Sequence, residues 1–285
     1  MIARSPAPTL DLPAELAFDA VAAGALLVDF IRRETRKAGF SRAVLGLSGG
    51  VDSAVAAFLA CRALGAKNVL CASLPYRTSS PDSVRDARRI VRLLGARSVR
   101  ISITPMIDAY FARQRGASAL RRGNKMARER MAVLYDLSAR EKALVVGTSN
   151  KSELLLGYGT IFGDLACGIN PLGDLYKTQV RSLALSLGVP QDVVFKVATA
   201  DLWAGQADET EIGYRYGDVD RLLCLLVDRR ATPDEAAAAG FPVRMVRRMM
   251  TRMVRSQFKR RTPLIAKLSP RTVGIDFLYP RDWGR

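Results

Sequence analysis

Residues 45–53, which read L-G-L-S-G-G-V-D-S, carry the residue types best suited to chemistry in this chain. Two adjacent glycines between a short apolar run and a helical pattern let successive backbone N–H groups turn toward one point, where the helix dipole adds positive potential. Such a loop binds an anionic phosphate. The Walker pattern, with its loop lysine for ordinary γ-phosphoryl transfer, is absent, so we expect a different bond of the nucleotide to be broken.

Asp52 stands at the start of the helix that this loop introduces. A carboxylate beside a phosphate is unfavourable unless a divalent cation lies between them, which makes Asp52 the first candidate Mg²⁺ ligand. The alternative is a tight turn in which the aspartate only caps a helix. The apolar run before the loop and the helical pattern after it favour the phosphate site.

The composition restricts the chemistry further. The chain has 285 residues and no histidine, which excludes the Ser-His-Asp triad, the Cys-His pair, His-ligated zinc and an imidazole base. The 44 Lys+Arg against 27 Asp+Glu give a net charge of +17, so nucleotides, nucleic acid and acidic membrane surfaces are all candidate partners. Acid–base work must fall to other groups, or the reaction must depend on electrostatics and positioning.

The cysteines and the apolar runs indicate a cytoplasmic protein. Cys61, Cys71, Cys167 and Cys224 lie far apart without a C-x-x-C pair, which favours neither a disulfide scaffold nor a zinc site. Residues 1–13 lack the pattern of a secretory leader, and no apolar run approaches membrane-span length. We expect no membrane partner.

Around the loop, strand-like apolar runs alternate with helical patterns. This alternation predicts the α/β class: a doubly wound, Rossmann-like parallel sheet with helices on both faces. The predicted strands are 43–47, 68–74, 98–103 and 143–147. The predicted helices are 14–38, 51–64, 80–94, a stretch around 105–140, one beginning in 150–156, and 174–187.

The remaining segments complete a single predicted domain over residues 1–285. Residues 159–175 are rich in Gly, Asp, Asn and Pro and indicate a long functional loop. Thr232 and Glu235 form a capping box that opens a short helix. Residues 243–257 form an amphipathic helix with a cationic face, and the chain from 259 to 285 is predicted to be an extended tail, so a basic C-terminal helix plus tail covers about 243–285. The pattern indicates no internal repeat and no second core.

The S-G-G-x-D-S loop resembles that of the ATP pyrophosphatases, which split ATP between the α- and β-phosphates and transfer AMP to an oxygen of the substrate. Further segments are similar, in the same order, to the ammonia-dependent NAD synthetase family. They are residues 123–131, 147–153, 157–158, 163–164, 175–180 and 208–214. The resemblance runs from about residue 20 to residue 270.

The resemblance implies a role for each matching residue. It implies an ATP site made of Gly46, Leu47, Ser48, Gly49, Gly50, Val51, Asp52 and Ser53, together with Thr148, Lys177 and Thr199. It implies that Asp52 and Glu153 hold Mg²⁺ and that Asp52, Glu153 and Lys177 are the catalytic group. It implies substrate binding by Asn124, Arg128, Asp164, Phe258 and Lys259. Without the resemblance, Glu153 could complement a helix dipole, Lys177 could be a surface lysine, and the two threonines could be caps.

The implied reaction is ATP-dependent amide formation. A carboxylate oxygen attacks the α-phosphorus of ATP, which gives an acyl adenylate and expels pyrophosphate, and ammonia then displaces AMP. In the family the acid is the nicotinate carboxyl of deamido-NAD, bound across a homodimer interface. No glutaminase domain is indicated, so ammonia would enter free or come from a separate partner protein.

Three substrate positions depart from the family pattern. Ile161 stands in place of a lysine, Gly168 in place of an aspartate, and Phe258 in place of a histidine. Lost hydrogen bonds and charge contacts weaken binding, so the alternative is a paralogue that amidates a different carboxylic acid by the same mechanism. A tRNA-modifying or nucleic-acid-binding protein is a further alternative, suggested by the arginines of 244–261. It is disfavoured because the arginines of the 243–257 helix have no aromatic residues interleaved among them for base stacking.

Overall fold

The computed structural model describes residues 10, 12–114, 116–203, 205–261 and 263–276. The expectations for the N-terminal residues 1–9 and for the end of the tail, 277–285, lie outside them. The strands are β1 (Arg42–Gly46), β2 (Val69–Ser73), β3 (Arg97–Arg100) and β4 (Ala143–Val145). The helices are α1 (Ala20–Lys37), α2 (Val51–Leu64), α3 (Pro81–Leu94), α4 (Thr104–Phe111), α5 (Ala119–Glu141), α6 (Lys151–Leu156), α7 (Lys177–Leu187), α8 (Gln191–Val194), α9 (Asp208–Ile212), α10 (Tyr216–Leu223), α11 (Pro233–Ala238) and α12 (Val243–Arg255).

The four strands form one parallel sheet in the order β3-β2-β1-β4. Beyond β4 the chain returns beside the same edge, where the Gly147 N–H donates to the Ile169 carbonyl (2.8 Å). The strand order reverses at β1, with β2 and β3 on one side of it and β4 on the other. The expected doubly wound parallel sheet is therefore confirmed.

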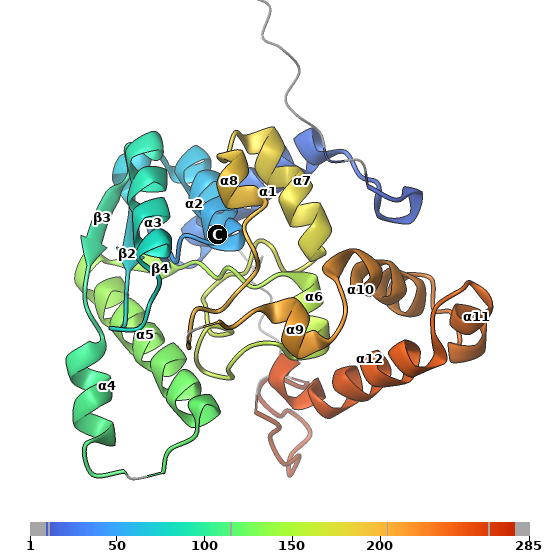
Figure 1. Cartoon of the computed structure of the whole chain (residues 1–285). Helices are drawn as coiled ribbons and strands as arrows, with labels where there is room; N and C mark the ends of the chain where they lie inside the picture. Colours follow the sequence, from blue (N-terminus) through green and yellow to red (C-terminus); the bar gives the residue numbers. More distant parts are fainter. Residues whose placement is uncertain (1–9, 11, 115, 204, 262, 277–285) are drawn as a thin grey trace, which may run out of the picture.

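Helices cover both faces of the sheet (Figure 1). On one face Leu45 of β1 packs in a cluster with Leu59 of α2 and Leu183 of α7. On the other face Val44 packs with Ile107 of α4 and Leu137 of α5. Adjacent β1 residues alternate between the two clusters because successive side chains of a strand point to opposite faces. Burial on both faces explains why residues 43–45 of β1 are all apolar.

A third hydrophobic cluster lies at the end of the molecule away from β3, where α10, α11 and α12 lie together (Figure 1). Its members come from segments far apart in the sequence, among them Leu16, Leu156, Tyr216 and Met249. The expectation that the chain has no second core is therefore wrong. No single segment indicates this cluster, because each contributes only a few apolar residues.

The helix predicted over 14–38 is wrong at its start. Ala14–Leu16 form a 3₁₀ turn, and α1 begins at Ala20 because the Asp19 carboxylate accepts hydrogen bonds from the N–H groups of the first turn (2.9 Å each). The other differences are smaller. The stretch around 105–140 divides into α4 and α5, and the helix predicted from 174 begins at Lys177.

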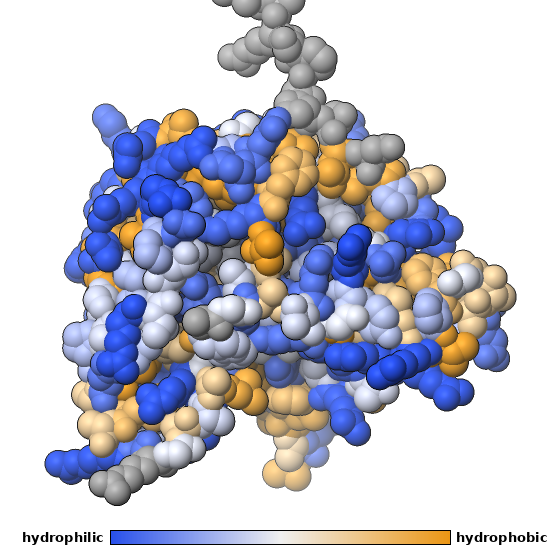
Figure 2. All heavy atoms as spheres, viewed as in Figure 1, coloured by the Kyte–Doolittle hydropathy of each residue, from blue (hydrophilic) through white to orange (hydrophobic). Residues whose placement is uncertain are grey.

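The face of the molecule in Figure 2 is largely hydrophilic, with hydrophobic side chains scattered between the charged ones. Within the described ranges, no helix combines the length and the apolar character needed to span a membrane.

Candidate active site

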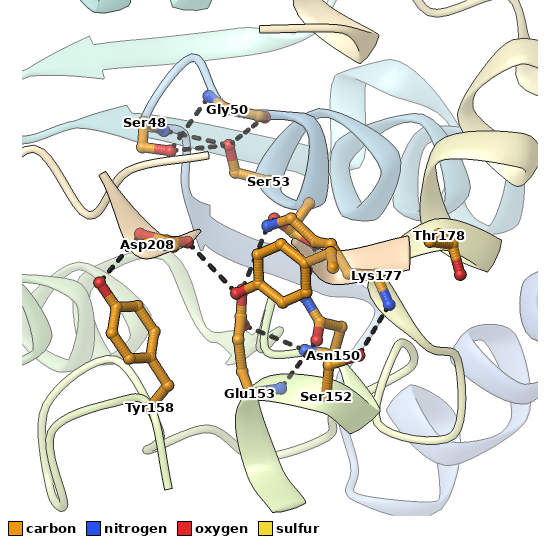
Figure 3. A network of polar contacts seen from close by, with 12 residues as sticks. Ser48, Gly50, Ser53, Asn150, Ser152, Glu153, Tyr158, Lys177, Thr178 and Asp208 are labelled. Atoms are coloured by element: carbon orange, nitrogen blue, oxygen red, sulfur yellow. Dashed lines mark hydrogen bonds and ion pairs between the residues drawn. The ribbon is translucent and has the colours of Figure 1, made fainter. Parts of the chain in front are cut away.

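The glycine-rich loop joins β1 to α2 at the point where the strand order reverses, which is where open α/β sheets bind ligands. Its turn is held by hydroxyl groups. The Gly50 N–H donates to Ser48 Oγ (3.3 Å), while Ser53 Oγ donates to the Gly50 carbonyl (3.0 Å) and accepts from the Ser48 N–H (3.2 Å) (Figure 3). These bonds fix the turn ahead of the α2 N-terminus, where an anionic group is favoured.

Gly49 is required by the packing of this loop. Its φ of +86° lies in the left-handed region, and a Cβ at this position would collide with the backbone carbonyl of Ser83 in α3. Only glycine satisfies both constraints. The loop therefore sits directly against the first turns of α3.

Three charged side chains from three helices meet beside the loop. Lys177 Nζ lies 2.6 Å from Asp52 Oδ2 and 3.2 Å from Glu153 Oε1, and the lysine is only 3% exposed. Burial alone would lower the pKa of Lys177, but the two carboxylates outweigh it and raise that pKa above its ordinary value. Burial raises the pKa of Glu153, and Lys177 opposes this effect. The structure thus brings together the predicted catalytic group.

Asn150 holds the two carboxylates in place. It begins α6 with a capping box, in which Asn150 Oδ1 accepts from the Glu153 N–H (3.0 Å) and Glu153 Oε2 accepts from the Asn150 N–H (3.3 Å). The other side of the amide donates from Nδ2 to Asp52 Oδ1 (2.9 Å). Asn150 is not among the site residues predicted from the sequence, although its spacing to Glu153 is the signature of a capping box.

The donor set is suited to a small divalent cation. Asp52 and Glu153 direct carboxylate oxygens at one point, which the Lys177 ammonium occupies in this structure. Among the described residues no group of three or more acidic or cysteine side chains could hold a metal. Mg²⁺ commonly uses one or two carboxylates and completes its coordination with phosphate and water. Asp52 and Glu153 fit that requirement.

A further carboxylate borders this cluster. Asp208, at the start of α9, is buried and accepts hydrogen bonds from the hydroxyls of Tyr158 (3.0 Å) and Tyr216 (3.4 Å). Burial raises the pKa of Asp208, and Lys177 opposes the shift. The ring of Tyr216 lies 5.3 Å from Lys177 Nζ. Asp208 and Tyr216 are not among the site residues predicted from the sequence, although residues 208–214 belong to the segments that resemble the family.

A cavity of about 550 Å³ opens beside the charged cluster. Its lining includes most of the predicted nucleotide-binding residues, namely Gly46, Leu47, Ser48, Gly50, Val51, Asp52, Ser53, Thr148, Lys177 and Thr199. Gly49 is absent from the lining because it faces α3. Arg130 lines the cavity as well, and its guanidinium donates to the carbonyl of Leu74 (3.0 Å). Arg130 is not among the site residues predicted from the sequence.

The predicted substrate residues divide into two groups. Asn124, Asp164 and Lys259 line the cavity; Thr160 links the first two, and Lys259 Nζ donates to the carbonyls of Gly157 and Gly159 (2.8 Å each). Arg128 and Phe258 are exposed and do not line it. The Arg128 guanidinium donates to the Ile161 carbonyl (3.2 Å), and Phe258 is 61% exposed.

The sequence model of the NAD synthase family matches residues 24–263. The chain belongs to the NAD synthase family. A curated relative in this family, the NH(3)-dependent NAD(+) synthetase of Chlorobium phaeobacteroides (strain BS1), is 54% identical over 258 residues, which cover 90% of this chain and 93% of the relative. The family resemblance inferred from the sequence is confirmed.

Solved structures of NAD synthase relatives have the same fold. The NMN synthetase from Francisella tularensis superposes with a TM-score of 0.78 at 31% identity, covering 88% of this chain and 99% of that one. The NH3-dependent NAD synthetase from Campylobacter jejuni, in complex with the nitrate ion, gives a TM-score of 0.75 at 34% identity, covering 88% and 100%. The charged cluster described above therefore lies in an NAD synthase scaffold.

Proposed function

We propose that this chain is an ATP-dependent, ammonia-consuming carbon–nitrogen ligase that adenylates the nicotinate carboxyl of deamido-NAD and amidates it to give NAD, AMP and pyrophosphate. The observation that carries the proposal is the buried Lys177 between Asp52 and Glu153, directly beside a phosphate-type loop at the sheet's switch point. The curated relative that matches nearly its whole length is named for this activity.

The chemistry follows from charge. Both steps develop negative charge on phosphate oxygens, and preorganised N–H groups and cations stabilise such charge without an imidazole. The α2 N-terminus would receive the phosphates, and Lys177 would reach them from α7. Asp52 and Glu153 would hold Mg²⁺, which when bound supplies Lewis-acid stabilisation of the departing pyrophosphate. Thr148 and Thr199 at the cavity wall would contact the nucleotide.

A second candidate substrate is a smaller nicotinate carboxylic acid, nicotinate mononucleotide. It is favoured by Gly168, which lacks the carboxylate common in the family at this position; a Cβ here would lie 2.5 Å from Leu144 Cδ1, so a larger side chain would require Leu144 to shift. It is favoured also by Lys259, whose ammonium is engaged by two loop carbonyls. One structural relative is an NMN synthetase.

A substrate screen tests the proposal. Pyrophosphate release is measured with ATP, magnesium and ammonium in the presence of deamido-NAD, nicotinate mononucleotide, nicotinate or no acid. We expect the highest kcat/KM with deamido-NAD. A preference for the mononucleotide would favour the second candidate, and release that does not depend on any of these acids would refute the ligase assignment. Saturation by ammonium alone would support uptake of free ammonia rather than delivery by a partner protein.

The proposed active form is a cytoplasmic homodimer. Exposed large hydrophobic side chains occur on α4 and α5, including Met106, Tyr110, Leu120 and Tyr135. Leu120 also lines the cavity, as does the predicted substrate residue Asn124. A second copy of the chain on this surface would therefore lie beside the part of the cavity where the carboxylic acid substrate is expected to bind. The four cysteines are free thiols, in keeping with a reducing compartment.

A further inference from the structure

Asp220 is a buried carboxylate that the proposed reaction does not use. It belongs to α10, is 0% exposed, and does not line the cavity. Its Oδ1 accepts from the Ser152 hydroxyl (2.6 Å), and its Oδ2 accepts from both the N–H (2.8 Å) and the hydroxyl (2.9 Å) of Thr178. Burying a carboxylate is unfavourable unless hydrogen bonds compensate for the lost water, so three donors on a buried Asp220 indicate that these contacts have a specific role.

The donors belong to the first turns of two different helices. Ser152 lies in the first turn of α6, next to Glu153, and Thr178 lies in the first turn of α7, next to Lys177. The Ser152 hydroxyl also accepts a hydrogen bond from the Lys177 N–H (2.9 Å). One carboxylate thereby ties the backbone of Lys177 and Thr178 to the residue that precedes Glu153.

The arrangement satisfies backbone donors that a helix cannot satisfy itself. The first N–H groups of α7 have no carbonyl partner within the helix, and a negative charge at this end is favoured by the helix dipole. Packing alone would be met by an apolar residue of similar size, but such a residue would leave the Thr178 N–H and hydroxyl without the acceptor that Asp220 provides. The charge therefore serves the placement of the α6 and α7 N-termini.

We propose that Asp220 is a positioning residue that fixes the starts of α6 and α7 relative to each other, so that Glu153 and Lys177 are held facing each other at the nucleotide site. The inference rests on the proposed function, because it assumes that Lys177 stabilises charge in the reaction. Asp220 belongs to α10, which packs with α11 and α12 in the third hydrophobic cluster. Through Asp220, these C-terminal helices would help to position the active-site residues.

The test compares Asp220→Asn with Asp218→Asn, an exposed aspartate of the same helix. An asparagine keeps the size of Asp220 and one acceptor, but its amide N–H₂ faces Ser152, whose hydroxyl then loses its acceptor. We expect kcat per ATP-binding site to fall about tenfold or more in Asp220→Asn, with an unchanged KM for ammonium, because an interaction of the transition state is lost. Asp218→Asn should match wild type.

A second variant separates positioning from folding. Ser152→Ala removes the link between Asp220 and the Lys177 N–H, and we expect about a fivefold loss of kcat. The double variant Asp220→Asn/Ser152→Ala should be no worse than the poorer single variant, because both act through one chain of hydrogen bonds. If Asp220→Asn does not fold, the kcat of Ser152→Ala alone tests the positioning role.

The outcomes distinguish this inference from the proposed function. Wild-type protein that forms no amide would refute the proposed function. Active wild type with full kcat per site in Asp220→Asn or in Ser152→Ala would overturn the positioning role. A lowered melting temperature with unchanged kcat per site would overturn it also, since that result describes a purely structural contact.

Discussion

At the scale of single residues, the site depends on one cation shared by two carboxylates. Lys177 contacts Asp52 and Glu153, and Asn150 links the same two acids on the other side. Removing one member of a buried charged group leaves the others uncompensated, which commonly costs about 3–5 kcal/mol. The individual residues therefore act as a unit, and their substitutions are not expected to be additive.

Asp52→Asn tests the center of this unit. The variant keeps the shape of the side chain but cannot pair with Lys177 or ligate a metal as a carboxylate. We expect substrate-dependent ATP–pyrophosphate exchange to fall about 100-fold or more. Asp82→Asn is the matched control, because Asp82 occupies the same position in α3 and, among the residues that the structure describes, its carboxylate pairs with the exposed Arg85 (2.8 Å). Unchanged exchange in Asp52→Asn would contradict both its metal and its charge-pairing role.

Asp220 should make stability depend on pH. Burial raises the pKa of Asp220 from 3.8 to about 6, although the hydrogen bonds from Ser152 and Thr178 oppose the shift. Because the folded pKa is the higher one, the folded state binds more protons between pH 4 and 6, so the contribution of this group is full below pH 4 and is lost as the pH rises. The change is about 3 kcal/mol.

The measurement is the difference in unfolding free energy between wild type and Asp220→Asn, determined in urea at pH 4 and at pH 7. Other acids cancel in this difference. We expect the unfolding free energy of wild type, relative to that of Asp220→Asn, to be larger at pH 4 than at pH 7. A difference that does not change with pH would show that Asp220 keeps its ordinary pKa in the folded protein.

At the scale of elements, the loop between β1 and α2 is shaped by its neighbour α3. Gly49 combines a positive φ with a close approach to the Ser83 carbonyl, whereas Gly39 has a similar φ (+83°) with no atom near its missing side chain. A side chain at Gly39 would suffer only the backbone strain of a positive φ, whereas a side chain at Gly49 would suffer this strain and a collision with α3. We expect Gly39→Ala to cost about 1 kcal/mol and Gly49→Ala about 2 kcal/mol more.

Chemical denaturation measures these costs, and KM for ATP reports the shape of the loop. Gly49→Ala should raise that KM, and Gly39→Ala should leave it unchanged. Equal losses of stability in the two variants would mean that contact with α3 does not constrain the loop.

The elements also show what could be predicted from the sequence. The bounds of α2 and α3 are predicted correctly because Gly50 with Gly65, and Ser80 with Gly95, mark their ends locally. The start of α1 is predicted too early, because the apolar residues before Asp19 continue the helical spacing although Asp19 caps the helix. The loop could be predicted from its motif, and the group of Asp52, Glu153 and Lys177 from the resemblance to the family. The third cluster and the contacts of Asp220 could not, because they join segments that are distant in the sequence.

At the scale of the whole molecule, the surplus charge and the exposed apolar residues point to different interactions. The net charge of +17 favours association with nucleotides through long-range attraction, and the face of the molecule in Figure 2 is largely hydrophilic. Exposed side chains on α4 and α5 offer a surface for a second copy of the chain.

Light scattering tests the proposed homodimer. We expect wild type to have twice the mass of one chain at micromolar concentration, and Tyr110→Glu to shift toward one chain with reduced activity, because a charge would be buried at the interface. Leu93→Glu is the control: Leu93 is 58% exposed on α3, comparable to the 51% of Tyr110 on α4. A single-chain mass for wild type would contradict the proposal.

The third cluster has a consequence for how the chain is made. Glu15 accepts a hydrogen bond from Arg221, 206 residues later (2.6 Å), and neighbouring Leu16 is buried in the cluster that α10 and α12 complete. During synthesis at about 5–20 residues per second, the first ordered residues wait roughly 10–40 seconds for their partners. A nascent chain as far as α7 therefore leaves Leu16 without its partners from α10 and α12 until those helices have been synthesised.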